Sequence, residues 1–263
     1  MNAVRPENRT NEIPVLEVRG LRKHYGMVEA LRGVDVDLYR GEVLGLVGDN
    51  GAGKSTFVKC LAGVHEADGG SMRLEGQLID FRSPHEGREA GIEVVYQELA
   101  LAPDLTVWGN IFLGRELHVH GPLRRFGWLD KRAMRSAARE HLARLKIEIS
   151  SVNKPIEALS GGQRQAVAIA RSVVWGRKVV LMDEPTNNLG VAEQQKVLGL
   201  TRTLADQNMA VLIVSHNLEH VFKVADRITV LRHGQSVATT RVSDTTPQQV
   251  VHWITGLSEI RTK

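Results

Sequence analysis

The sequence lacks the features that would place a protein within or beyond a membrane. No run approaches the roughly 18 apolar residues of a membrane-spanning helix, so we expect a soluble or peripheral protein. Residues 1–14 are polar and charged and lack the apolar segment of a secretory signal, so we expect a flexible N-terminal tail. The single cysteine, Cys60, excludes an intrachain disulfide and suits a reducing compartment. Its apolar neighbours predict a buried thiol rather than a reactive one.

The excess of positive over negative charge is also small. A formal net charge of +4 is too small to indicate nucleic-acid binding. The densest basic stretch, 124–135, alternates with small and apolar residues, which favours a solvated helix face; contact with an anionic membrane surface or a partner is the alternative. With 42% hydrophobic residues in 263, the chain can form one sizeable domain.

A phosphate-binding motif stands near the start of the chain. Gly48–Ser55 fits the pattern G-x-x-x-x-G-K-[ST], between an apolar run, Val43–Val47, and a helical pattern at 56–62. The glycines allow the backbone N–H groups to point at phosphate oxygens, and the following helix adds the positive end of its dipole. We expect Lys54 to reach the β- and γ-phosphates and the Ser55 hydroxyl to bind Mg²⁺.

Apolar strand patterns alternate with helical patterns along the chain. Strands are predicted at 15–18, 34–38, 43–47, 92–96, 178–182, 210–214, 227–231 and 236–239, with a hairpin at 71–80. Helices are predicted at 161–175, 191–204 and 248–254, and the whole of 106–151 has a helical pattern. This alternation indicates an α/β fold with a mostly parallel core sheet and nucleotide at its carboxyl edge. We expect one domain, 15–263, with an inserted helical subdomain at about 98–175.

A second motif, Leu159–Gln165, precedes an apolar-periodic helix. Ser160 and Gln163 form a capping box, and a simple helix N-cap is one interpretation. Gly161 and Gly162 favour a binding role in addition to the N-cap, because two glycines at a helix start are costly unless something approaches the backbone closely. A phosphate is a natural candidate.

Two further motifs follow predicted core strands. Asp183 and Glu184 end the apolar run Val179–Met182, where Asp183 can hold Mg²⁺ through water and Glu184 can polarise an attacking water. His216 follows the strand 210–214, where it can donate a hydrogen bond to a γ-phosphate and orient Glu184. Taken alone, a solvated acidic turn and a structural histidine are the alternatives.

Gln97 and Tyr25 give weaker signals. Gln97 directly follows the strand 92–96, and its carboxamide can ligate Mg²⁺ weakly. The Tyr25 ring can stack on adenine, although an ordinary core tyrosine is an equal alternative.

Together these motifs resemble the nucleotide-binding subunit of an ATP-binding-cassette (ABC) transporter, over about residues 15–240. In order they match the A-loop (Tyr25), Walker A (Gly48–Ser55), the Q-loop (Gln97), the signature (Leu159–Gln165), Walker B with its catalytic glutamate (Val179–Glu184) and the switch histidine (His216). The resemblance implies a P-loop NTPase cassette with a mostly parallel core sheet, an antiparallel β subdomain and an inserted helical subdomain.

The resemblance implies catalytic roles for Glu184, His216, Lys54 and Gln97. It implies Mg²⁺ ligation by Ser55, Gln97 and Asp183. It implies ATP contacts from Tyr25, Gly48, Asp49, Asn50, Gly51, Ala52, Gly53, Lys54, Ser55, Thr56, Ser160, Gly161, Gly162 and Gln163.

Within the family, the chain is similar to the ATPases of bacterial monosaccharide importers of the ribose, xylose and fructose type. The similarity lies in residues 96–99, 110–116, 159–170 and 184–191. Gly190 stands where most ABC ATPases have aspartate in the D-loop, as in this subgroup, and Asn187–Asn188 replace the expected small residues.

The resemblance also implies partners. We expect a second copy of the chain, so that each ATP lies between the Walker motifs of one subunit and the signature of the other. We also expect permease subunits against residues 98–116, a periplasmic sugar-binding protein, no nucleic acid, and a peripheral location on the cytoplasmic face of the membrane. The alternative is a soluble ABC ATPase acting on nucleic acid or ribosomes, although the coiled-coil insertions or second cassette of such proteins are absent. A non-catalytic ATP-gated module is disfavoured by Glu184 and His216.

Overall fold

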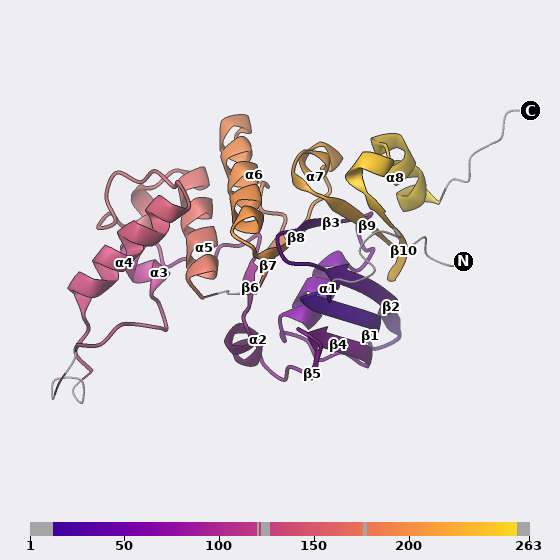
Figure 1. Cartoon of the computed structure of the whole chain (residues 1–263), viewed down its shortest axis with the longest axis horizontal. Coiled ribbons are helices and arrows are strands. Elements are labelled where there is room, and N and C mark those ends of the chain that lie inside the picture. The colour runs from indigo at the N-terminus through magenta and orange to yellow at the C-terminus, as the bar shows by residue number, and fades with distance from the viewer. Residues whose placement is uncertain (1–12, 120, 122–126, 176–177, 257–263) are drawn as a thin grey trace, which may run out of the picture.

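A computed structural model describes residues 13–119, 121, 127–175 and 178–256, so most of the expected N-terminal tail lies outside the described residues. The described residues form two β-sheets, with helices packed on the larger sheet and a group of helices extending to one side (Figure 1).

The larger sheet has six strands in the order β10-β9-β3-β8-β7-β6. Their bounds are β3 (Val43–Val47), β6 (Ile92–Val95), β7 (Val179–Asp183), β8 (Ala210–Val214), β9 (Arg227–Arg232) and β10 (Gln235–Arg241). All neighbours from β9 to β6 are parallel, and only β10 pairs antiparallel, with β9. Every residue of β3 and β8 is buried, as strands covered on both faces require. The predicted, mostly parallel core sheet is confirmed.

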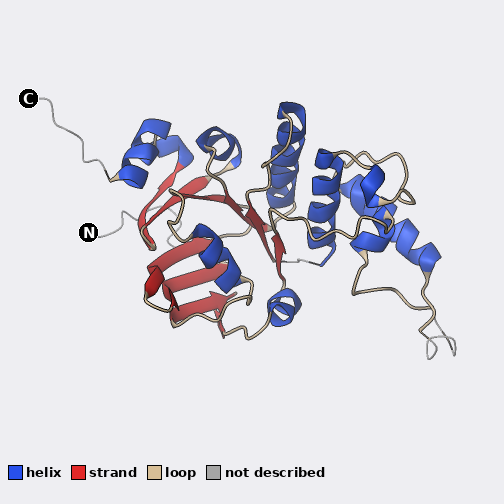
Figure 2. Ribbon diagram, turned by 180° about the vertical axis from the view of Figure 1, so that it is seen from behind, coloured by secondary structure: helices blue, strands red, loops and turns tan. Residues whose placement is uncertain are grey.

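The smaller sheet is antiparallel, in the order β2-β1-β4-β5. Its strands are β1 (Leu16–Tyr25), β2 (Val28–Leu38), β4 (Gly69–Leu74) and β5 (Gln77–Ile79), the last two forming the predicted hairpin. Phe57, Val58 and Leu61 of helix α1 (Lys54–Leu61) share one buried cluster with both sheets. Figure 2 shows this helix beside the strands of both sheets. Cys60 is buried in the same cluster, as predicted.

Helices α6 (Val191–Asp206), α7 (Leu218–Val224) and α8 (Pro247–Thr255) pack on the opposite face of the core sheet (Figure 1). A further helix, α2 (Pro84–Ala90), was not predicted from the sequence. Its signal is short but complete, because Ser83 accepts a hydrogen bond from Glu86 N and Pro84 occupies the first turn.

The segment between β6 and β7 contains α3 (Val107–Ile111), α4 (Lys131–Arg144) and α5 (Gly161–Trp175). The prediction of helix throughout 106–151 is wrong after α4, at 145–151, and between α3 and α4, where an isolated antiparallel bridge joins His118 to Leu129. Glycines at 114, 121 and 127 all have positive φ, which a helix does not accommodate. Arg124 and Arg125 lie outside the described residues.

The helical faces of α4 agree with the sequence pattern. Met134, Ala138 and Leu142 are buried. The basic residues of this helix, Lys131, Arg132 and Arg135, are exposed, and whether this face meets only solvent stays a prediction.

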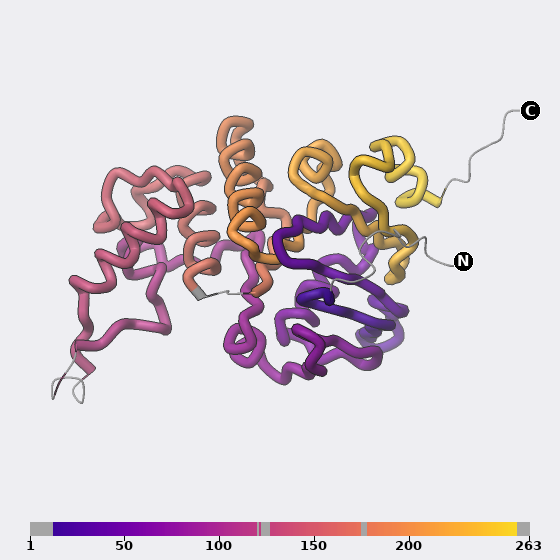
Figure 3. Tube along the Cα trace, viewed as in Figure 1, coloured from indigo at the N-terminus to yellow at the C-terminus, as the bar shows by residue number. Residues whose placement is uncertain are grey.

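An early strand of the smaller sheet lies against the last strand of the larger sheet. β10 lies beside β2 (Figure 3), where Arg32 N donates to Gly234 O at 2.7 Å and Asp35 N donates to Ser236 Oγ at 3.1 Å.

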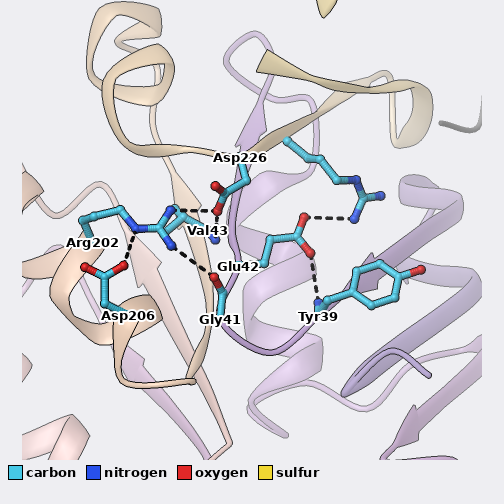
Figure 4. Close-up of polar contacts among 8 residues, drawn as sticks. Tyr39, Gly41, Glu42, Val43, Arg202, Asp206 and Asp226 are labelled. Atoms are coloured by element: carbon cyan, nitrogen blue, oxygen red, sulfur yellow. Dashed lines mark hydrogen bonds and ion pairs between the residues drawn. The ribbon is translucent and has the colours of Figure 1, made fainter. Parts of the chain in front are cut away.

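A polar network closes the amino-terminal edge of the core sheet (Figure 4). The buried Glu42 carboxylate accepts from Arg227 Nη1 at 2.9 Å and from Tyr39 N at 3.1 Å. Arg202 and Val43 N both donate to Asp226 Oδ2 at 2.8 Å. The Glu42–Arg227 pair is buried, whereas Arg202 and Asp226 are partly exposed. The polar residues of the motifs lie at the other edge of the sheet.

Candidate functional site

Three neighbouring parallel strands bring the motifs together. In the strand register, Leu46 of β3 and Asp183 of β7 both pair with Val214 of β8. The residues that follow these strands, namely the phosphate loop Gly48–Ser55, Glu184 and His216, therefore emerge from the same carboxyl edge. This is the edge at which parallel α/β sheets bind ligands.

Lys54 is folded back over the phosphate loop. Its Nζ donates to Gly48 O at 2.8 Å and to Asp49 O at 2.9 Å, and the residue is only 8% exposed. Burial lowers the pKa of Lys54, and the nearby carboxylates of Glu184 and Asp183 act in the opposite direction. The Lys54 ammonium group thus lies within the loop.

The phosphate loop is packed against two distant parts of the chain. A Cβ on Gly53, whose φ is 101°, would lie 2.6 Å from Ala30 O in β2. A Cβ on Gly48 would lie 2.2 Å from Leu231 O in β9. In addition, Gly234 N donates to Ala52 O at 3.0 Å. The loop is therefore packed closely against β2 and β9, and neither Gly48 nor Gly53 has room for a side chain.

Ser55 and Asp183 form a pair suited to a hard cation. The Ser55 hydroxyl is hydrogen-bonded to the Asp183 carboxylate. The pKa of Asp183 is raised, chiefly by burial, and the bond from Ser55 acts in the opposite direction. Asp183 Oδ1 is buried without a hydrogen-bond partner among the described residues. A hydroxyl and an unsatisfied carboxylate oxygen are ligands that Mg²⁺ accepts, so this pair fits the ion. No group of three or more His, Cys, Asp or Glu side chains in the described ranges could hold a metal, so phosphate and water oxygens would complete the shell.

Glu184 and His216 face each other, as the sequence predicts. His216 Nδ1 lies 2.9 Å from Glu184 Oε2, with the glutamate side chain 13% exposed and the histidine 60%. Glu184 has a φ of 51°, and its N–H donates to Val214 O at 3.0 Å. A left-handed conformation in a residue other than glycine is costly and is concentrated at functional sites. It turns the Glu184 side chain out of the strand and toward His216.

A buried histidine that the sequence reasoning missed ties this pair to the next segment. His220, only 7% exposed, lies on α7 with its Nδ1 3.1 Å from Thr186 Oγ1 and its Nε2 3.3 Å from Asn217 Nδ2. Thr186 lies two residues after Glu184, and Asn217 directly follows His216. The His220 imidazole therefore connects the loop after β7 with the loop after β8. No local sequence signal marks His220, because a histidine on a helix face is ordinarily structural.

The second motif forms the predicted capping box. Ser160 N donates to Gln163 Oε1 at 3.1 Å, and Gln163 N donates to Ser160 Oγ at 3.3 Å. What approaches the glycines closely is Glu193, in the first turn of α6. Its Oε1 accepts from Ser160 Oγ at 2.9 Å and from Gly162 N at 3.1 Å. These bonds, the one from Ser160 first, hold the pKa of Glu193 below its usual value.

Sequence reasoning missed this contact. A Cβ on Gly162 would lie 2.8 Å from Cβ and Cγ of Glu193, so the close approach expected of the glycines is made by a carboxylate of the chain itself. The available signal was an acidic residue in the first turn of a helix, which alone names no partner.

Gln97 and Tyr25 stand at strand ends. Gln97 is exposed and follows β6 after Tyr96. Tyr25 ends β1 and is 43% exposed, with its ring edge-on to His65 at 5.5 Å, so it is not a core tyrosine. Their predicted contacts with Mg²⁺ and adenine remain predictions.

Residues 31–187 match the family described as "ABC transporter". The chain belongs to the ABC transporter family. It is an ATP-binding ATPase.

Named relatives align over nearly the whole chain. The fructose import ATP-binding protein FrcA of Rhizobium meliloti is 48% identical, over 94% of this chain and 95% of the relative. The xylose/arabinose import ATP-binding protein XylG of Sulfolobus acidocaldarius is 43% identical, over 93% and 95%. The ribose import ATP-binding protein RbsA 1 of Streptomyces coelicolor is 41% identical, but the chain spans only 48% of its length.

Solved structures agree on the fold. The ADP form of MJ1267, an ATP-binding cassette of an ABC transporter, superposes with a TM-score of 0.80 at 26% identity, over 94% of this chain and 100% of that one. A dimeric post-hydrolysis state of the cassette MJ0796, bound to ADP and Pi, has a TM-score of 0.70 at 25% identity, over 86% and 98%. The predicted cassette fold is confirmed. In the ranges that the structure describes, every helix is too short or too polar to cross a bilayer.

Proposed function

We propose that this chain hydrolyses ATP to drive the import of a monosaccharide, such as fructose, ribose or xylose, through a membrane permease. The observation that carries hydrolysis is the Glu184–His216 pair at the sheet edge beside Lys54. Sugar import is supported by relatives of nearly equal length, named as fructose and xylose/arabinose import ATP-binding proteins.

Each residue of the site has a role that its position suits. Lys54 neutralises the β- and γ-phosphates, and the N–H groups at the start of α1 bind their oxygens. Glu184 accepts a proton from the attacking water, and His216 holds the Glu184 carboxylate and the water in line. Ser55 and Asp183 would hold Mg²⁺, with Gln97 as a further ligand; the ion supplies charge neutralisation on the phosphates.

The complete site requires two copies of the chain. Among the described residues, the side-chain hydrogen bonds of Ser160 and Gly162 are made with Gln163 of α5 and Glu193 of α6, and none is made with the phosphate loop of the same chain. We propose that ATP on one copy is closed by the signature of the other, so that hydrolysis removes the γ-phosphate and reopens the pair. A dimeric cassette among the structural relatives supports this arrangement.

The other partners and the domain organisation follow from the same proposal. Residues 15–263 form one cassette, in which residues 98–175 are the inserted helical subdomain and residues 98–116 face the permease subunits. A periplasmic binding protein delivers the sugar, and the chain lies at the cytoplasmic face of the membrane.

The test uses Glu184→Gln, which should bind ATP, release almost no phosphate and accumulate as an ATP-dependent dimer. Tagged Glu184→Gln is recovered from native membranes with ATP, and its partners are identified by mass spectrometry. The control is the double variant Glu184→Gln/Lys54→Ala, which cannot close on ATP.

A permease and a sugar-binding protein in the ATP sample alone would support the importer, and ligand screening of that binding protein would name the sugar. Ribosomes or nucleic-acid proteins in place of a permease would refute transport while leaving the ATPase intact. Normal phosphate release by Glu184→Gln would refute the role of Glu184.

A further inference from the structure

The signature motif of this chain already holds an anion of its own. Ser160 Oγ and Gly162 N, at the start of the 15-residue helix α5, both donate to one oxygen, Oε1 of Glu193. We propose that the Glu193 carboxylate is an internal occupant of the signature, which the γ-phosphate of an ATP on a second copy must displace. The proposal rests on the proposed function, because it requires two copies to close on ATP.

The geometry makes the carboxylate and a phosphate alternatives. A hydroxyl and a helix-terminal N–H that converge on one oxygen form a general anion site, and a phosphate oxygen accepts from them as a carboxylate oxygen does. Ser160 Oγ and Gly162 N each have a single hydrogen to donate, so the two acceptors cannot both be satisfied. The Glu193 carboxylate and a phosphate bound to the same donors would also repel each other, because both are negatively charged.

Gly162 shows that the contact is built into the fold. Gly162 lies within α5, where alanine would favour the helix. A Cβ there would lie 2.8 Å from Cβ and 2.9 Å from Cδ of Glu193, so only glycine admits this side chain. The glycine that leaves room for a phosphate in the closed pair also leaves room for Glu193 in the single chain.

Displacement of Glu193 would act on the D-loop. Glu193 is in the first turn of α6, and its N–H donates at 2.9 Å to the carbonyl oxygen of Gly190, the last of the D-loop residues 187–190. When Glu193 Oε1 leaves Ser160, the polar link between α5 and the start of α6 is broken. The arrival of a partner's ATP is thereby transmitted to the segment that leads back to Glu184.

The test measures ATP-dependent dimerisation in the Glu184→Gln background. Sedimentation velocity over a series of MgATP concentrations gives the ATP concentration at half-maximal dimer. Adding Glu193→Gln, which keeps the size and removes the charge, should lower this midpoint by about two- to fivefold, the factor that corresponds to a solvent-exposed charged pair. Glu193→Asp, whose carboxylate is one methylene shorter, should lower it as well.

Glu86→Gln is the matched control. Glu86 also stands in the first turn of a helix and accepts a backbone hydrogen bond, from Arg82 N at 2.9 Å, but it lies on α2. It should leave the midpoint unchanged. Binding of a fluorescent ATP analogue to dilute single chains should be equal in all variants, because Glu193 does not contact the phosphate loop of its own chain.

The possible outcomes separate the two proposals. If Glu184→Gln alone does not dimerise with ATP, the proposed function fails. If it dimerises but Glu193→Gln and Glu193→Asp leave the midpoint unchanged, the competition does not exist. A higher midpoint with unchanged thermal stability would mean that Glu193 supports the signature, which also overturns the inference.

Discussion

Gly51 and Gly53 offer a matched test of how the phosphate loop is held. Both have positive φ, 78° and 101°. A Cβ on Gly51 meets nothing within 4 Å, whereas one on Gly53 would lie 2.6 Å from Ala30 O and 2.9 Å from Leu31 Cδ2. Alanine therefore imposes backbone strain at both positions and a steric clash at Gly53 alone.

The two costs have different sizes. Left-handed backbone costs an alanine roughly 1–2 kcal/mol, and insertion of a methyl group into packed surroundings costs about 1–3 kcal/mol more. We expect Gly51→Ala to lower the free energy of unfolding by about 1–2 kcal/mol and Gly53→Ala by about 2–5 kcal/mol. For a chain of this length, the corresponding falls in Tm are roughly 2–8 °C and 4–20 °C.

Scanning calorimetry of the nucleotide-free protein measures both variants against the wild type. Nucleotide is left out because any difference in ATP affinity would shift Tm by itself. Equal losses at the two positions would refute the argument, since they would show that the Ala30 carbonyl is not a rigid wall. Serine in place of alanine at Gly53 should be no better tolerated, because the clash begins at Cβ.

Three further predictions concern single side chains. Lys54→Ala should weaken ATP binding at least about tenfold in titration calorimetry, and unchanged affinity would contradict its role. Cys60 has a pKa raised by burial to about 11, so maleimide should label it slowly in the native protein and rapidly in urea; equal rates would show an exposed thiol. Bonds from His24 N and Lys23 lower the pKa of Asp68 to about 2 from 3.8, so its contribution is present above about pH 4 and is lost toward pH 2. Asp68→Asn should therefore destabilise the protein near pH 6. The difference in free energy of unfolding between variant and wild type, measured by urea denaturation, should shrink as the pH falls toward about 2.

The fold was most predictable where strands are buried on both faces. Val43–Val47 and Ala210–Val214 are unbroken apolar runs, and their predicted bounds agree with β3 and β8. β1 and β2 extend well beyond the predicted 15–18 and 34–38, because polar residues continue the antiparallel pairing up to Tyr25 and Val28. The stretch between α3 and α4 was misread as helix because the helical spacing of Met134, Ala138 and Leu142, which belongs to α4 alone, was extended back over it.

Within the site, the order of the motifs predicted which residues lie at the same edge of the sheet, but it did not predict their hydrogen-bond partners. Because parallel strands end at one edge, Glu184 and His216 could be placed together from the sequence, and they lie 2.9 Å apart. Neither the Glu193 contact with Ser160 nor the His220 contact with Thr186 could be found in this way. Both join residues more than thirty positions apart through loop geometry that no local pattern encodes.

The packing of the phosphate loop has a consequence for how the protein is made. The loop rests on Ala30 from one side and on Leu231 and Gly234 from the other, and the latter two are translated far later. At roughly 5–20 residues per second, synthesis takes on the order of ten to forty seconds to pass from the loop to that turn. A nascent chain in this interval has the complete nucleotide motif but not its support. We therefore expect ATP affinity to arise late in translation, when β9 and β10 leave the exit tunnel and close the sheet.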